Sequence, residues 1–94
     1  MGEEHGYGRT YTRQRRTGRQ QEKQRIGLRL REVRKARGLT QDQVAALLSL
    51  NRTAYTHYEN GTNLPDIFTL LQLAGIYEYP PEEFIRYLTS WDQA

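Results

Sequence analysis

Apolar residues recur along this chain at the spacing of short amphipathic helices separated by turns. Between residues 22 and 37, Ile26, Leu30 and Val33 lie four and three positions apart, which places them on one helical face. Gly38 then ends this first predicted helix, because glycine adopts the left-handed conformation after a helix at little steric cost. Two later helices are predicted, one from 66 to 75 or 77 and one at 81–90, with the apolar residues Ile67, Leu70, Leu71, Leu73, Ala74, Phe84, Ile85, Leu88 and Trp91.

Residues 40–61 predict two very short helices joined by about three residues. Thr40 opens a capping box at the start of the first helix, residues 41–48. Asn51 is a suitable N-cap for the second helix, residues 52–60. This length of connection is the spacing of a helix-turn-helix. The positions expected in its core are Val44, Ala45, Leu48, Leu50, Tyr55 and Tyr58.

The second short helix carries polar residues on the face opposite this core. The face offers hydrogen-bond donors and acceptors, one permanent cation and no carboxylate, which suits a groove lined with base edges and phosphates. Its residues are Arg52, Thr53, Thr56, His57 and Asn60. Tyr55 occupies a core position, and we expect its hydroxyl to reach the rim or water, since a buried hydroxyl needs a partner.

The stretch from Ile26 to Phe84 resembles the lambda-repressor-like (Cro-type, XRE) helix-turn-helix family. The residues that carry the resemblance are Ile26, Leu30, Arg34, Gly38-Leu39-Thr40-Gln41, Ala45, Tyr58-Glu59-Asn60-Gly61, Pro65, Leu70, Leu71 and Ala74. The resemblance implies an all-α, compact five-helix DNA-binding domain that needs no cofactor. It also implies a transcriptional regulator that binds double-stranded DNA sequence-specifically, as a homodimer, with its recognition helix (about 52–60) in the major groove.

The resemblance also implies roles for single residues. It pairs Arg34 with Glu59, which ties the first helix to the end of the third; the alternative is an ordinary exposed arginine of little energetic consequence. It places Gln41 against a DNA phosphate, where the alternative is a plain helix-start residue. The candidate base contacts are Arg52, Thr53, Thr56 and His57, and the candidate backbone contacts are Gln41, Asn51, Asn60, Thr62 and Arg29.

Charge is distributed unevenly along the 94 residues, whose net charge is +3. Residues 1–25 carry seven Arg and Lys against three Glu, and residues 26–61 carry six against three acids. Residues 62–94 carry one Arg against five acids. A polyanion is the natural partner of the basic part, whereas a solvated helix face with a soluble tail is the simpler explanation of the same pattern.

Residues 1–21 consist mainly of Gly, Arg, Gln and Thr, with too few apolar residues to offset the entropy of ordering. We therefore predict a disordered basic N-terminal arm at 1–21 and a helix-turn-helix domain at 22–94. The arm either follows the DNA backbone or enters a minor groove, or it is only a solubilising tail.

The composition argues against an enzyme and against a metal site. The chain has no Cys and only two His, and it lacks paired carboxylates, a nucleophile motif and a glycine-rich phosphate loop. No run approaches the apolar length of a membrane span, and no signal peptide is recognised, so we predict a cytoplasmic protein.

A protein-binding role is the alternative function, because antitoxins and protein-bridging adaptors use the same fold and fold does not fix function. Surplus apolar surface on the last helix, from Phe84, Leu88 and Trp91, predicts a contact with a protein partner or a second copy. Simple packing of that helix on the first one is an equally good explanation.

Overall fold

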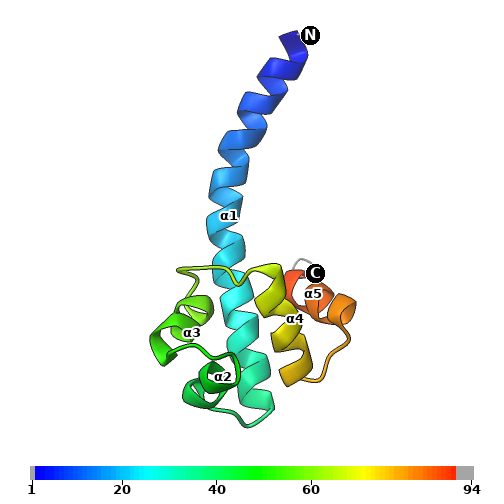
Figure 1. Cartoon of the computed structure of the whole chain (residues 1–94). Helices are drawn as coiled ribbons and strands as arrows, with labels where there is room; N and C mark the ends of the chain where they lie inside the picture. Colours follow the sequence, from blue (N-terminus) through cyan, green and yellow to red (C-terminus); the bar gives the residue numbers. More distant parts are fainter. Residues whose placement is uncertain (1, 91–94) are drawn as a thin grey trace.

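The structure is a computed structural model that describes the backbone of residues 2–90 and the side chains of residues 19–90. The described part of the chain is all-α, as predicted (Figure 1). Its elements are α1 (Gly2–Ala36), α2 (Gln41–Leu47), α3 (Arg52–Glu59), α4 (Ile67–Ile76) and α5 (Pro81–Thr89).

Helix α1 begins much earlier than the sequence predicted, at Gly2 rather than near Glu22. Its N-terminal half projects away from the other four helices, while its C-terminal half lies among them (Figure 1). The prediction rested on a shortage of apolar residues, which limits packing; helix propensity is a separate property, and Arg, Gln, Glu and Lys all favour helix. The boundary between arm and domain stays a prediction, since the side chains of residues 1–18 lie outside the described ones.

The core forms around the C-terminal half of α1, which packs against α3 on one side and α5 on another. Helix α2 packs on α3, and α4 packs on α5. Gly27 is buried where α1 crosses the end of α3. The buried apolar residues are Leu30, Val33, Val44, Ala45, Leu48, Tyr55, Leu73, Ala74, Tyr77, Phe84 and Leu88.

Local capping explains where the three middle helices begin. The side chains of Thr40, Asn51 and Asp66 each accept a hydrogen bond from a backbone N–H three residues later. Thr40 and Gln43 complete the predicted capping box, since the Gln43 amide oxygen accepts the Thr40 N–H. Each cap satisfies a donor that a helix start otherwise leaves unpaired.

The exposed apolar surface is larger on α4 than on α5, where Ile85 exposes 36% of its surface, and the described residues of the predicted partner surface do not contribute to it. Phe84 and Leu88 are buried in the core, and Trp91 lies outside the described residues. On α4, by contrast, Ile67, Phe68 and Leu71 expose 65%, 70% and 46% of their surface. Leu73 and Ala74 of α4 are buried and Leu70 and Ile76 are partly buried against the core, so the core covers only part of the apolar surface of this helix.

No helix in the described part of the chain is both long enough and apolar enough to cross a membrane.

Candidate nucleic-acid interface

The outer face of α3 brings the predicted base contacts together. Arg52, Thr53, Thr56, His57 and Asn60 line one shallow hollow on this face. Arg52 and Thr53 are exposed in the first turn, whereas Thr56 and His57 are half-buried one turn later. The hollow contains one permanent cation and no acid, so it can donate hydrogen bonds to base edges and phosphates.

An ion pair behind this face holds α3 against α1. Arg34 Nε donates to Glu59 Oε2 at 2.6 Å, and Arg34 Nη2 donates to Glu59 Oε1 at 3.1 Å. The two residues expose 8% and 6% of their surface, so the pair is buried. Arg34 Nη1 also donates to the carbonyl oxygen of Leu39, just before α2. One guanidinium therefore connects three segments of the fold.

Glu59 is held in its ionised form despite its burial. Burial raises the pKa of this carboxyl, but hydrogen bonds from Arg34, Tyr55 and Gln41 outweigh burial and lower the pKa below its ordinary value. The carboxylate therefore acts only as an acceptor near neutral pH.

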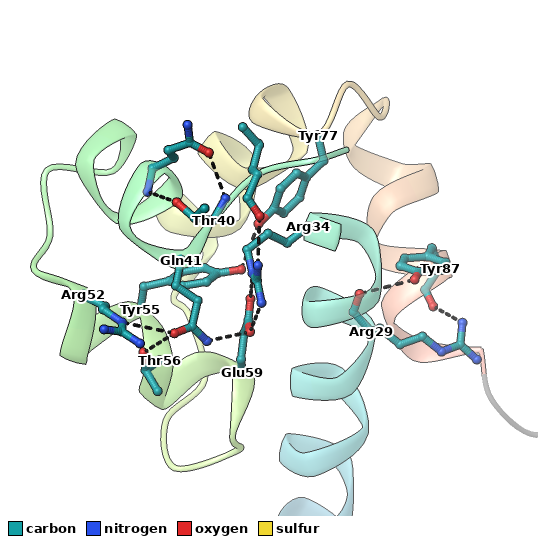
Figure 2. A network of polar contacts seen from close by, with 12 residues as sticks. Arg29, Arg34, Thr40, Gln41, Arg52, Tyr55, Thr56, Glu59, Tyr77 and Tyr87 are labelled. Atoms are coloured by element: carbon teal, nitrogen blue, oxygen red, sulfur yellow. Dashed lines mark hydrogen bonds and ion pairs between the residues drawn. The ribbon is translucent and has the colours of Figure 1, made fainter. Parts of the chain in front are cut away.

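Gln41 lies between this buried pair and the outer face of α3 (Figure 2). Its Nε2 donates to Glu59 Oε1 at 2.9 Å. Its Oε1 accepts from Thr56 Oγ1 at 3.0 Å and from Arg52 Nε at 3.4 Å. The contact with Glu59 uses one of the two N–H groups of Nε2, and the predicted phosphate contact of this side chain stays a prediction.

The hydroxyl of Tyr55 has a buried partner, so the expectation that it reaches the rim or water was wrong. Tyr55 and Tyr77 are both fully buried, and their hydroxyl oxygens lie 2.8 Å apart. Burial raises the pKa of Tyr55 above its ordinary value and raises that of Tyr77 to about 12. Tyr77 follows α4 directly, and nothing in the local sequence pattern pairs it with Tyr55.

The predicted backbone contacts divide into two groups. Asn51 caps α3 with its side chain, and Asn60 accepts hydrogen bonds from the N–H and hydroxyl of Thr62 just after α3. These three residues are exposed near the candidate base contacts. Thr62 and Asn60 thus form a local turn that presents polar groups at the end of α3.

Arg29 lies elsewhere, which corrects its predicted place among the backbone contacts. Its guanidinium donates to the carbonyl oxygens of Tyr87 at 2.9 Å and Ser90 at 3.1 Å. It also lies over the Tyr87 ring, 5.1 Å from the centroid. Figure 2 shows this group well apart from Arg52. A cation at the carboxyl end of α5 satisfies carbonyls that the helix leaves unpaired.

A second hollow at the start of α2 contains a cation that the predictions did not include. Arg31 and Arg52 line this hollow together with Thr40, Gln41 and Asp42. Arg31 is exposed on α1. Its sequence signal was weak, because it was one of several cations covering the polar face of the first predicted helix.

Comparisons with known proteins agree with this geometry. The family model described as helix-turn-helix matches residues 30–84. A solved structure, the restriction-modification controller protein C.AhdI from Aeromonas hydrophila, is 34% identical and superimposes with a TM-score of 0.60. The match covers 65% of this chain and 88% of that one.

Two curated relatives are transcriptional regulators by name. The uncharacterized HTH-type transcriptional regulator YqaE of Bacillus subtilis is 41% identical over 49 residues, which is 52% of this chain and 42% of the relative. The cryptic phage CTXphi transcriptional repressor RstR of Vibrio cholerae is 34% identical over 56 residues, 60% of this chain and 50% of the relative. The chain therefore spans about half the length of the curated relatives that it matches.

Proposed function

This chain belongs to the XRE-type helix-turn-helix family, and on that premise we propose that it is a transcriptional regulator that binds double-stranded DNA sequence-specifically. The observation that carries the proposal is the outer face of α3. There, an acid-free set of donors and acceptors is held outward by a buried ion pair at the back of the same helix.

In the proposed complex, α3 lies in the major groove with its N-terminal residues nearest the bases. Arg52 is exposed at the first position of α3, where its outer nitrogens are free to bind a guanine in a bidentate manner; such a contact discriminates between bases by about 1–3 kcal/mol. Thr53, Thr56 and His57 contact neighbouring bases. The candidate backbone contacts are Gln41, Asn51, Asn60 and Thr62, to which Arg31 is added.

The charge distribution supports this orientation. Residues 26–61, which contain α2 and α3, carry six cations against three acids, whereas residues 62–94 carry one cation against five acids. Long-range attraction therefore presents the α2–α3 side to a polyanion and turns the α4–α5 side away. The basic N-terminal extension of α1 adds further positive charge, and its contact with the DNA backbone is part of the proposal.

The active form in this proposal is a two-fold homodimer that binds half-sites about 34 Å apart. The support is the apolar patch of α4, formed by Ile67, Phe68 and Leu71, which is too exposed to belong to the core. Leu64 and Leu47 are also exposed, with 42% and 59% of their surface accessible. A symmetric contact through α4 removes this surface from water.

The experiment that tests the function selects preferred duplexes from a random pool and then compares binding of the preferred and scrambled sites. Arg52→Ala should lose preference for the selected site more than general affinity. Arg31→Ala is the matched control, and it should weaken both duplexes alike and reduce the salt slope of binding by about 1. If Arg52→Ala loses the same affinity for the preferred and the scrambled duplex, base recognition by this residue is refuted.

The exposed apolar patch of α4 also favours a second candidate, an antitoxin or a protein-bridging adaptor that captures another protein through this helix. Weak DNA binding without sequence preference, together with tight capture of a protein that Phe68→Ser abolishes, would favour the adaptor over the regulator.

A further inference from the structure

We infer that Glu59, acting through Gln41, is a positioning residue for Arg52, so that the buried ion pair influences which base pair the protein prefers. The inference rests on the proposed function and deepens it. Its basis is the uninterrupted row of polar contacts from α1 to the outer face of α3: Arg34, Glu59, Gln41 and Arg52 (Figure 2).

The first step is the orientation of the Gln41 amide. Glu59 is ionised and can only accept hydrogen bonds, so the Gln41 group facing it must be the NH2 and not the carbonyl. The opposite orientation would bring the Gln41 oxygen against a carboxylate oxygen, and two acceptors would then face each other. The carboxylate therefore determines which way the amide points.

The second step is the effect of this orientation on α3. With its NH2 committed to Glu59, Gln41 directs its oxygen toward Thr56 Oγ1 and Arg52 Nε. These two donors lie one helical turn apart on α3. A single acceptor thus holds the first turn and the second turn of the recognition helix at the same point.

The third step is the consequence for Arg52. Its contact with Gln41 uses only Nε, so the outer N–H groups of the two terminal nitrogens, which lie at the far end of the guanidinium, stay unoccupied by Gln41. Two terminal nitrogens in one plane are what bidentate recognition of guanine requires. An arginine held in advance loses less side-chain entropy on binding than a free one.

The ion pair itself is insulated from the DNA, since Arg34 and Glu59 are both buried. Glu59 is therefore a positioning residue rather than a contact, and the hydrogen bonds that link it to Arg52 run through Gln41. Hydrogen bonds from Arg34 and Gln41 help to lower the pKa of Glu59, so this arrangement persists throughout the neutral pH range.

The test is a double-mutant cycle between Gln41→Met and Arg52→Ala. Methionine preserves the length of the side chain but removes both the donor and the acceptor. The quantity measured is the ratio of dissociation constants for two duplexes that differ only at the base pair where Arg52→Ala abolishes preference. Gln43→Met is the matched control, because Gln43 lies on the same helix and its side chain accepts a hydrogen bond from the backbone N–H of Thr40, away from Glu59 and Arg52.

We expect Gln41→Met to reduce this ratio by about twofold or more, which corresponds to the smallest coupling seen between contacting residues. The same substitution should change nothing when Arg52 is already alanine, and Gln43→Met should leave the ratio unchanged. An equal reduction in the Arg52→Ala background, or a uniform loss of affinity for both duplexes, overturns the inference.

Glu59→Gln provides a second variant. A glutamine at this position can present either an oxygen or an NH2 to Gln41, so it no longer determines which way the Gln41 amide points. In the free protein, the Nε–H proton of Arg52 should exchange with water faster in Glu59→Gln and in Gln41→Met than in the unaltered chain. Unchanged exchange in Gln41→Met overturns the inference even if Glu59→Gln does not fold.

The failure of this inference differs from the failure of the proposed function. If the unaltered chain shows no preferred duplex, the proposed function itself is wrong. If the chain prefers a duplex and Arg52→Ala removes the preference while Gln41→Met does not, only the positioning role is lost.

Discussion

Gly27 on α1 and Glu59 on α3 approach each other so closely that no side chain fits between their backbones. A Cβ atom on Gly27 would lie 2.3 Å from the carbonyl oxygen of Glu59 and 2.7 Å from that of Tyr58. In the sequence, a glycine near the start of a predicted helix is merely a weak helix former. In the structure, it allows the crossing that brings Arg34 within reach of Glu59.

Gly27→Ala should therefore destabilise the fold although alanine is the better helix former. The added methyl group meets backbone atoms that cannot move independently, and overpacking of this kind costs about 1–3 kcal/mol. Gly75→Ala is the control, because a Cβ on Gly75, inside α4, meets no atom within 4 Å and should stabilise the fold by about 1 kcal/mol. Urea unfolding of both variants measures the difference, and a stabilised Gly27→Ala would contradict the close crossing.

Stability should fall on acidification in a way that depends on Glu59. Because hydrogen bonds lower the pKa of Glu59 in the folded state, the unfolded chain binds a proton more readily than the folded one. The stabilising contribution is complete above the ordinary glutamate pKa of about 4.3 and is lost as the pH falls through the lower folded value.

Glu59→Gln tests this pH dependence. At pH 7 the variant leaves Arg34 buried without its counter-ion, which should lower the free energy of unfolding by roughly 3–5 kcal/mol. The difference in the free energy of unfolding between the variant and the unaltered chain should narrow below about pH 4, as Glu59 of the unaltered chain becomes protonated. A difference in unfolding free energy that stays constant from pH 7 to pH 3 would mean that the charge of the carboxylate does not contribute to stability.

The paired hydroxyls of Tyr55 and Tyr77 should show strong energetic coupling. Tyr55→Phe leaves the Tyr77 hydroxyl buried without a partner, at an expected loss of about 1–3 kcal/mol. Adding Tyr77→Phe removes the orphaned group, so the double variant should be no less stable than the single one. Thermal unfolding of the four proteins completes the cycle, with Tyr58→Phe, at a half-buried position on the same helix, as the control. Strictly additive losses would argue against the hydrogen bond.

The apolar patch of α4 should control self-association. Phe68→Ser removes the most exposed large apolar side chain of the patch and should weaken the proposed dimer about tenfold or more, without unfolding the protein. Leu28→Ser is the control, since Leu28 is 58% exposed on α1 and lies outside the patch. Sedimentation velocity measures both variants. Identical behaviour of the two, or an unaltered chain that is monomeric at all concentrations, would remove α4 as the dimer contact.

Short-range chemistry made the helix-turn-helix segment predictable. Thr40, Asn51 and Asp66 each cap a helix through a backbone group three residues away, so their effect is visible in the local sequence. The outward face of α3 was predictable for a related reason, because positions on a helix of known start repeat with a fixed angle. Arg52, Thr53, Thr56 and His57 accordingly lie together in the structure as expected.

The sequence by itself therefore determined the all-α class, the boundaries of α2 to α5 within a few residues, and the composition of the face that we propose contacts DNA. Only the tertiary structure decided that Arg29 caps α5, that Gln41 faces Glu59, that Tyr55 pairs with Tyr77 and that the apolar residues Ile67, Phe68 and Leu71 of α4 are exposed. The reason is physical: caps and helical periodicity act over three or four residues, whereas the partner of a side chain depends on which distant helix crosses it, and at what rotation.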